Sequence, residues 1–296
     1  MTDENPHHPA TETVAEIVAL ALAEDRVGFD VTTRATVPPD QPGEATLLMK
    51  QSGVICGLVV FAEAFAQVSP DVEVELLVDE GQWVKAGMTV AEIAGPLAAI
   101  LSAERVALNL VQRMSGIATL AQQYQDKARD GGPARVVDTR KTTPGLRALE
   151  RYAVRTGGAA NHRNTLEDGV LIKDNHLAAA AARGVGIRVL LAEVRQRVPH
   201  TLRIEIEVTT PEMAREALEG GADVILLDNM TPDMMRGIVT EARANPAYAR
   251  VLFEASGGIT LDTIKEVAAT GVDLISCGAL THSAPALDLS LEVRPA

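Results

Sequence analysis

The feature that most constrains the fold is a short unit that recurs six times in the second half of the chain. In each unit an apolar run ends in polar or charged residues. The runs lie at residues 135–141, 169–176, 203–208, 223–229, 250–256 and 272–278, and amphipathic helix candidates lie at 211–219, 232–244 and 261–269. Buried strands that alternate with helices predict a parallel sheet. Six units are fewer than the eight of a closed (β/α) barrel, so an incomplete barrel and a doubly wound sheet both fit.

The first part of the chain lacks this alternation, and its mixture of elements predicts an α+β domain. We expect helices at residues 11–25, 58–68 and 96–127, the last one broken near Ser115 and Gly116. Strands are expected at residues 45–49 and 72–78, and a glycine-punctuated hairpin turn at 80–87. The length of 296 residues suits two domains, and an aromatic content of 3% favours aliphatic buried strands over an aromatic-rich sandwich.

Charge is distributed unevenly along the chain. The formal net charge is −13, which argues against a general nucleic-acid partner because such proteins present a basic surface. Residues 138–176 nevertheless contain seven Lys or Arg against five acids, a net charge of +2, so the remainder carries −15. A cationic segment within an acidic protein predicts a focused site for a small anion.

Basic residues follow the first two predicted strands. Arg140 and Lys141 come after the first strand, where an arginine can clamp a carboxylate or phosphate in a bidentate manner and a lysine acts as a point charge. A solvated turn explains one cation more easily than a pair. His162 and Arg163 follow small residues, and Lys173 directly ends the second strand. Lys173 fits a phosphate ligand or a Schiff-base lysine.

Acidic and glycine-rich segments follow the later strands. In residues 203–208 polar and apolar residues alternate, so Glu205 and Glu207 point into the barrel if Ile204, Ile206 and Val208 face the helices. An exposed edge strand explains the same alternation. Asp228 ends the next strand, as a ligand for Mg²⁺ or a ribose hydroxyl would. Two glycine-rich turns offer backbone N–H groups to phosphate. They contain Ser256, Gly257, Gly258, Gly278 and Ala279.

Arg105 lies in the long predicted helix, on the same stripe as Leu101 and Leu108. An arginine at the edge of an apolar stripe can extend its charge to solvent, or it can serve a subunit interface. Cys56 and Cys277 are far apart and form no CxxC motif, which favours two reduced buried thiols. The N-terminus lacks the features of a signal peptide, and no apolar run approaches the length of a membrane span. We therefore expect a cytoplasmic protein without a membrane partner.

Ordered motifs along most of the chain resemble the quinolinate phosphoribosyltransferase family, also called nicotinate-nucleotide pyrophosphorylase (carboxylating). The motifs lie at residues 30–33, 102–109, 115–119, 138–145, 157–164, 171–176, 205–208, 226–229, 255–259 and 276–283. One departure is Phe29, which stands where the family usually has glycine before the aspartate. It lies remote from the residues with predicted chemistry.

The resemblance implies a fold and a domain division. It implies an incomplete (β/α) barrel of the type II phosphoribosyltransferase kind over residues 117–282, which is catalytic. It also implies an N-terminal α+β sandwich domain over residues 1–116, joined by the C-terminal tail 283–296. The family resemblance further implies a homodimer in which Arg105 enters the neighbouring active site.

The resemblance also implies the substrates and the residues that bind them. The substrates are quinolinate and phosphoribosyl pyrophosphate, and the products are nicotinate mononucleotide, pyrophosphate and CO₂ in NAD biosynthesis. Quinolinate is bound by Arg105, Thr139, Arg140, His162, Arg163 and Lys173. Phosphoribosyl pyrophosphate is bound by Lys141, Lys173, Glu207, Asp228, Ser256, Gly257, Gly258, Gly278 and Ala279. Glu207 and Asp228 are the expected Mg²⁺ ligands.

Three alternatives stay open on the sequence alone. A related enzyme on the same scaffold could act on another heteroaromatic acid, and the number of cations separates these cases because nicotinate has one carboxylate. An aldolase could use Lys173 as a Schiff-base lysine. A lipoyl-type carrier is suggested by the turn at residues 80–87, although a lysine at the centre of a tight turn is not evident there.

Overall fold

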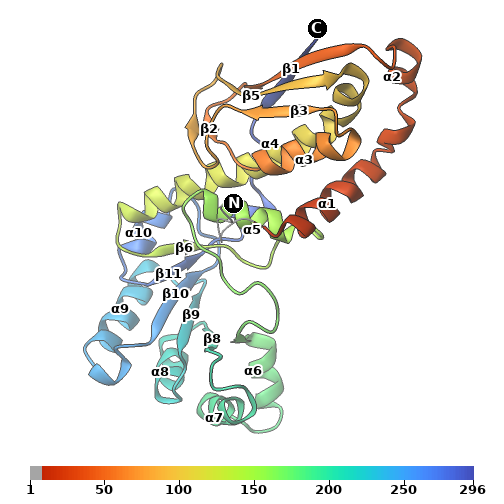
Figure 1. Ribbon diagram of the computed structural model, residues 1–296. Helices are drawn as coiled ribbons and strands as arrows, with labels where there is room; N and C mark the ends of the chain where they lie inside the picture. Colours follow the sequence, from red (N-terminus) through yellow and green to blue (C-terminus); the bar gives the residue numbers. More distant parts are fainter. Residues whose placement is uncertain (1–8) are drawn as a thin grey trace. The chain divides into compact units, whose positions relative to one another are not determined.

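The computed structural model describes residues 9–296, which divide into two compact units (Figure 1). The first unit comprises residues up to Gln122 together with Lys141–Gly158 and Ala279–Ala296. The second unit comprises Gln123–Arg140 and Ala159–Gly278. No helix in the described part of the chain combines the length and the hydrophobicity that a membrane span requires.

The first unit is built on a four-stranded sheet in the order β12-β1-β5-β3, with all pairs antiparallel. In β1 alternate residues, Ala45, Leu47 and Met49, are buried, as a strand with one face on a core requires. Helix α3 supplies Phe61 and Phe65 to the core, and Figure 1 shows it running along the sheet. The strands are β1 Pro42–Met49, β3 Glu73–Leu76, β5 Thr89–Pro96 and β12 Leu289–Pro295, with the short antiparallel pair β2 Gly53–Val54 and β4 Trp83–Val84.

Helices were predicted at residues 11–25, 58–68 and 96–127, and the structure has a helix at each of these places; the other helices of this unit were not predicted. The helices are α1 Thr11–Glu24, η1 Val27–Phe29, α2 Val31–Thr36, α3 Leu58–Val68, α5 Arg147–Thr156 and α11 Ala279–His282, with α4 Leu97–Arg129 continuing into the second unit. The segment predicted as a turn at residues 80–87 contains β4 instead of a simple hairpin turn. Because β12 pairs along the length of β1, the C-terminal tail completes the sheet of the first unit.

The predicted break in the long helix near Ser115 and Gly116 is wrong, because α4 runs unbroken through both residues. The hydroxyl of Ser115 instead bonds to the backbone of Cys56. Gly116 is needed for space, since a Cβ atom there would overlap the carbonyl oxygen of Pro285. The small pair thus marks a close approach of a distant chain segment to a continuous helix.

The second unit contains a six-stranded, fully parallel sheet in the order β6-β11-β10-β9-β8-β7. Sequence neighbours are sheet neighbours from β7 to β11, so the sheet has no point at which the strand order reverses and is not doubly wound. Strands β6 and β7 form the two edges, and the barrel is therefore incomplete. The strands are β6 Arg135–Val137, β7 Val170–Ile172, β8 Ile204–Val208, β9 Val224–Asp228, β10 Leu252–Ser256 and β11 Leu274–Ser276.

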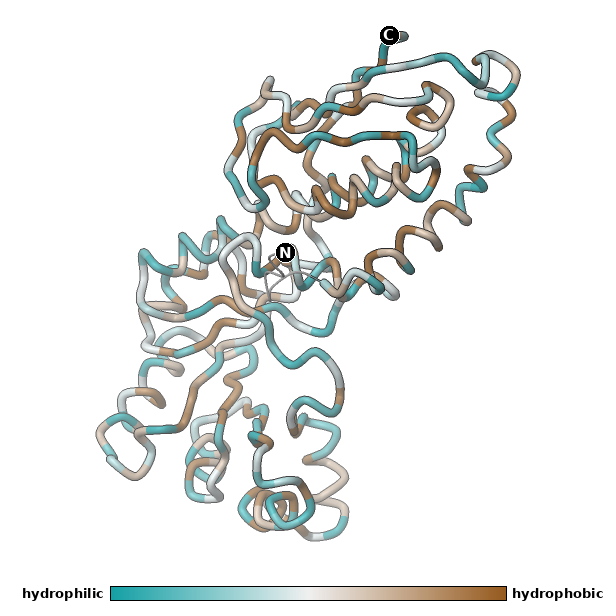
Figure 2. Tube along the Cα trace, viewed as in Figure 1, coloured by the Kyte–Doolittle hydropathy of each residue, from teal (hydrophilic) through white to brown (hydrophobic). Residues whose placement is uncertain are grey.

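Helices follow the strands of this sheet in the usual (β/α) manner. They are α6 Asp174–Ala181, α7 Ile187–Arg197, α8 Pro211–Glu219, α9 Pro232–Arg243 and α10 Ile264–Ala268, with η2 Pro246–Tyr248. Thr210 and Thr231 cap α8 and α9 by accepting a backbone N–H, and each helix then begins with proline. Figure 2 shows hydrophobic residues along the sheet, whereas the helices carry both hydrophobic and hydrophilic residues, as one buried face predicts.

Two equivalent aspartates stabilise the amino ends of the strands. Each precedes a strand, accepts a backbone N–H near the start of a neighbouring strand, and pairs with an arginine of a helix. The bonds join Asp223 to Ile204 N and Arg195 Nη2, both at 2.7 Å, and Asp273 to Phe253 N at 2.8 Å and Arg243 Nη2 at 2.7 Å. Charged groups at this end therefore serve stability, which leaves the carboxyl end for chemistry.

The close packing of Gly116 predicts that Gly116→Ala lowers the stability of the protein by about 1–3 kcal/mol, because the new methyl group overlaps backbone. Gly237 in α9 is the matched control, since a Cβ atom there meets nothing within 4 Å. Gly237→Ala should raise stability by about 0.5–1 kcal/mol through helix propensity. Urea unfolding measures both, and an equal stabilisation by the two substitutions would contradict the packing argument.

Candidate active site

The carboxyl ends of the six parallel strands meet at one edge of the sheet, and the polar residues of the second unit gather there. The parallel register places Asp228 of β9 opposite Ser256 of β10, and Glu207 of β8 opposite Leu226 of β9. Residues Asp138–Arg140 follow β6, and Lys173 follows β7. Side chains from distant parts of the sequence are therefore brought to one face by the topology alone.

Lys173 and Glu207 form an ion pair between β7 and β8, with Nζ 3.6 Å from Oε2. The lysine side chain is 48% exposed, so it can also reach an incoming anion. Burial raises the pKa of Glu207, the charge of Lys173 lowers it, and Asp228 raises it again. Asp228 is thus close enough to interact electrostatically with Glu207, and the two acids could share a cation.

The guanidinium groups of Arg140 and Arg163 lie close enough to repel each other. Burial lowers the pKa of Arg163, and the positive charge of Arg140 lowers it further. Arg163 Nη1 donates to Gly169 O at 3.1 Å, and Arg140 Nε is buried without a hydrogen-bond partner among the described residues. Two neighbouring half-buried cations are stabilised by an anion between them, because it offsets both their partial desolvation and their repulsion.

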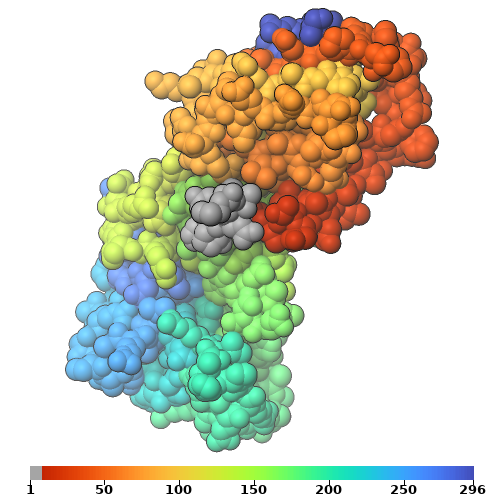
Figure 3. Space-filling view, viewed as in Figure 1, coloured from red at the N-terminus to blue at the C-terminus, as the bar shows by residue number. Residues whose placement is uncertain are grey.

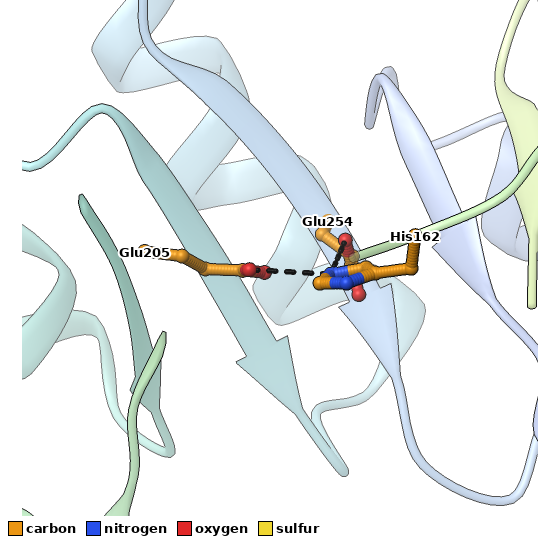
Figure 4. A group of neighbouring side chains, drawn as sticks. All are labelled: His162, Glu205 and Glu254. Atoms are coloured by element: carbon orange, nitrogen blue, oxygen red, sulfur yellow. Dashed lines mark ion pairs between the residues drawn. The ribbon is translucent and has the colours of Figure 1, made fainter. Parts of the chain in front are cut away.

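A buried histidine–diglutamate cluster lies within the sheet, made of His162, Glu205 of β8 and Glu254 of β10 (Figure 4). His162 Nε2 is 3.2 Å from Glu205 Oε2 and 3.3 Å from Glu254 Oε2. Strand β8 lies between β7 and β9, so the alternative of an exposed edge strand is wrong. Its alternation does place Glu205 and Glu207 on the inner face, as predicted, with Ile204, Ile206 and Val208 buried.

The cluster holds an extra proton. Burial of the ring opposes its charge, but the nearby carboxylates of Glu205 and Glu254 outweigh this and raise the pKa of His162 to about 10. Burial raises the pKa of Glu205, and the charge of Glu254 adds to the rise. Because the three groups are coupled, the proton that these shifts favour belongs to the cluster and not to the ring alone. Since Nδ1 of the ring accepts a backbone N–H, this proton lies on the side of Nε2 and the two carboxylates.

The ring nitrogen Nδ1 of His162 accepts the backbone N–H of Arg163 at 2.7 Å. Nδ1 therefore has no proton, and in the neutral ring Nε2 carries it and points it at the glutamates. Although His162, Glu205 and Glu254 place three possible metal-ligand atoms within 4.8 Å of one another, a metal-bound histidine normally donates its other ring N–H. Because Nδ1 of His162 accepts a hydrogen bond and does not donate one, the ring does not fit a metal ligand in this cluster.

Asp138 holds the loop that carries His162 and Arg163. It directly follows β6, and its side chain is fully buried. Its carboxylate accepts Asn161 Nδ2 at 2.6 Å and the backbone N–H of His162 at 2.9 Å. The loop is also tied to β6 through backbone bonds between Ala160 and the Val136–Asp138 segment. Asp138 after β6, Glu205 on β8 and Glu254 on β10 therefore contact one short loop, residues 161–163.

The predicted glycine-rich turns differ from each other in structure. Gly257 and Gly258 both have positive φ angles, of 99° and 58°, which glycine adopts without strain. A Cβ atom on Gly257 would overlap the side chain of Asn229, the left-handed residue after β9. Helix α10 begins only at Ile264, within the helix candidate at residues 261–269, so it does not directly follow this first turn. Gly278 directly precedes α11, as expected for the second turn.

Three predicted site residues belong to the first unit. Arg105 lies on α4 with a side chain that is 62% exposed, and Glu104 lies 3.7 Å from its guanidinium. Lys141 is exposed, and its carbonyl oxygen accepts the hydroxyl of Thr281 at 3.0 Å. Ala279 begins α11. Thr139 belongs to the second unit, between the buried Asp138 and Arg140.

Glu254 is the residue that sequence reasoning missed. Its side chain is 1% exposed, between Phe253 and Ala255, which are fully buried. An acidic residue inside an otherwise apolar parallel strand was the available signal, because such a carboxylate must find a partner.

Family models match nearly the whole chain. The model described as quinolinate phosphoribosyl transferase, N-terminal domain, matches residues 30–115. The model described as quinolinate phosphoribosyl transferase, C-terminal domain, matches residues 117–292.

Similar proteins and a solved structure give the same family. The chain is 46% identical over 273 residues to a probable nicotinate-nucleotide pyrophosphorylase [carboxylating] of Synechocystis, covering 92% of this chain and 90% of that protein. It is 43% identical over 267 residues to the similarly named protein of Bacillus subtilis, covering 90% and 89%. The structure of nicotinate-nucleotide pyrophosphorylase from Francisella tularensis superposes with a TM-score of 0.88 at 33% identity, covering 96% of each chain.

Proposed function

The chain belongs to the quinolinate phosphoribosyltransferase family, and on that premise we propose how its residues carry out the reaction. The enzyme transfers phosphoribose from phosphoribosyl pyrophosphate to quinolinate with decarboxylation. The products are nicotinate mononucleotide, pyrophosphate and CO₂, and the reaction belongs to de novo NAD biosynthesis. The observation that supports the site assignment is the pair of mutually repelling guanidinium groups of Arg140 and Arg163.

Quinolinate fits these cations because it carries two carboxylates on adjacent ring carbons. Arg140 and Arg163 bind the two carboxylates, each in the bidentate manner that guanidinium allows. The exposed ammonium of Lys173 adds a third positive charge. Thr139 contributes through its backbone, and His162 belongs to the same pocket. A substrate with one carboxylate would leave part of this charge unmatched, which disfavours nicotinate as the alternative substrate.

Phosphoribosyl pyrophosphate binds along the ends of β8 to β11. Glu207 and Asp228 act on the ribose hydroxyls and on Mg²⁺, whose preference for carboxylate oxygens fits these two neighbouring acids. The loop Ser256–Gly258 and the Gly278–Ala279 turn offer backbone N–H groups to phosphate, because their glycines let the ligand approach closely. Lys141 and Lys173 supply positive charge to the pyrophosphate.

Catalysis then follows from position and charge. The ring nitrogen of quinolinate attacks the anomeric carbon as the bond to pyrophosphate breaks, and positive charge builds on the ribose. Glu207 and Asp228 stabilise that charge electrostatically. Bound Mg²⁺ would supply positive charge to the leaving pyrophosphate. The adjacent carboxylate leaves as CO₂, with its bonding electron pair drawn toward the quaternised ring nitrogen, and the ring carbon then takes a proton.

The Schiff-base and carrier alternatives are less well supported. Lys173 is half exposed and paired with Glu207, whereas a Schiff-base lysine is activated in an apolar pocket or beside another cation. The segment at residues 80–87 contains β4, which pairs with β2 inside the first unit. A cytoplasmic location and the absence of membrane and nucleic-acid partners stay predictions.

We also propose a homodimer in which Arg105 serves the partner's active site. The first unit exposes three large apolar side chains near its N-terminal helices, with Leu20 at 72%, Phe29 at 65% and Val31 at 77%. Figure 3 shows α1 and α2 at the surface of this unit. A cavity of about 540 Å³ beside them is lined by residues of α1, α2, α3 and α4, including Ser102. Such a surface suits association with a second copy.

Turnover requires the cations at the strand ends. Purified protein with quinolinate, phosphoribosyl pyrophosphate and Mg²⁺ should release CO₂ and form nicotinate mononucleotide. Lys173→Ala should lower kcat/KM by about 10²–10³-fold, because a charge that meets both substrates is lost, and Arg140→Ala should behave similarly. Lys265→Ala, an exposed lysine on α10, is the control and should be unaffected. Trapping of a borohydride adduct on Lys173 would instead favour the aldolase.

The shared active site can be tested by mixing two inactive variants. A 1:1 mixture of Arg105→Ala and Lys173→Ala subunits should regain about a quarter of wild-type activity, because half of the dimers are mixed and one of their two sites is intact. The recovery is measured after exchange of subunits under mild denaturant. Absence of recovery, with mixed dimers demonstrated by mass spectrometry, would remove the shared-site proposal and leave the reaction unchanged.

A further inference from the structure

Two buried acids of the second unit have no part in substrate binding or in the transfer step. Glu205 and Glu254 face the interior from β8 and β10, and both are buried. Figure 4 shows their carboxylates converging on the ring of His162 from two strands. Burial of two carboxylates side by side is unfavourable unless hydrogen bonds compensate for their lost hydration. Both carboxylates face the ring of His162, so we ask what this ring contacts in turn.

Glu254 depends on His162 for its compensation. Neither of its carboxylate oxygens has a hydrogen bond of good geometry among residues 9–296, and its ion-pair partner is Nε2 of His162 at 3.3 Å. Glu205 has one oxygen toward the same nitrogen at 3.2 Å, while its other oxygen is buried without a partner. A single ring N–H thus lies between two carboxylates, which fixes the ring strongly in one orientation.

The orientation of the ring has a consequence for Arg163. Nδ1 accepts the Arg163 backbone N–H at 2.7 Å, and the guanidinium donates to Gly169 O at 3.1 Å. Arg163 is therefore held at its backbone and at its side chain. Arg140 repels it electrostatically, so an unrestrained guanidinium would move away. Glu205 and Glu254 hold the imidazole of His162, and the imidazole in turn holds the backbone N–H of Arg163.

We propose that Glu205, Glu254 and His162 form a positioning relay that holds Arg163 beside Arg140, so that the two guanidinium groups are preorganised for the two carboxylates of quinolinate. The proposal rests on the proposed function of the pocket. It assigns Glu254 a role in substrate affinity without contact to the substrate. It also makes His162 a positioning residue, because both of its ring nitrogens are used in the relay.

The relay predicts a selective loss of quinolinate affinity. Glu254→Leu should raise the KM for quinolinate by about tenfold and leave the KM for phosphoribosyl pyrophosphate within about twofold, because only the dicarboxylate depends on Arg163. Glu254→Gln keeps an acceptor for Nε2–H and should recover most of the loss. Glu241→Leu, which removes an exposed acid of α9, is the matched control and should leave both KM values unchanged.

A double-mutant cycle with Arg163→Lys decides whether the effect passes through Arg163. In that background Glu254→Leu should change the KM for quinolinate little, because the group being positioned is already gone. An equal change in both backgrounds, or a parallel rise of both KM values, would overturn the relay. Wild-type activity is measured in the same assay, so loss of the proposed function appears as an inactive wild type and is distinct from an additive cycle.

A spectroscopic measurement on the wild type tests the relay even if Glu254→Leu fails to fold. Nitrogen NMR of histidine-labelled protein, with the signals of His162 identified through His162→Asn, should show an unprotonated Nδ1 and a protonated Nε2. A proton on Nδ1, or displacement of the Nε2 proton when Mn²⁺ or Zn²⁺ alone is added, would overturn the assignment.

Discussion

The repulsion between Arg140 and Arg163 is the interaction on which the rest of the site depends. Two half-buried guanidinium groups close together are unfavourable in the free protein, since Arg163 is partly desolvated and the charge of Arg140 lowers its pKa further. A ligand with two adjacent carboxylates relieves both terms at once. Repulsion between the two guanidinium groups in the free enzyme therefore contributes to specificity, because a ligand with two carboxylates removes this repulsion and a ligand with one does so less completely.

The fold supplies the restraint that this repulsion requires. Asp138 after β6, Glu205 on β8 and Glu254 on β10 converge on the loop of residues 161–163, so the loop is fixed by acids from three strands of the sheet. Strands β8 and β10 have a neighbouring strand on each side, and an aspartate carboxylate accepts a backbone N–H near the amino end of each. The acids also explain how a cationic pocket exists in a protein of net charge −13: positive groups face the ligand, and negative groups lie behind them.

Much of the fold could be predicted from the sequence, because the information was local. Each apolar run of the second half is a strand of the parallel sheet, and alternation in residues 203–208 placed Glu207 on the inner face. The continuous course of α4 was not predictable, since Gly116 is required by the close approach of Pro285, which is far away in the sequence. The strand order and the contacts of Glu254 could not be predicted for the same reason, because they arise between strands that are distant in the sequence. The binding roles of the site residues stay predictions.

The most direct test of the account is calorimetric titration of the enzyme with quinolinate and with nicotinate, which differ by one carboxylate. If Arg140 and Arg163 together bind a dianion, quinolinate should bind at least about tenfold more tightly than nicotinate, and Arg163→Gln should remove most of that difference. Equal affinities for the two acids in the wild type would contradict the paired-cation site.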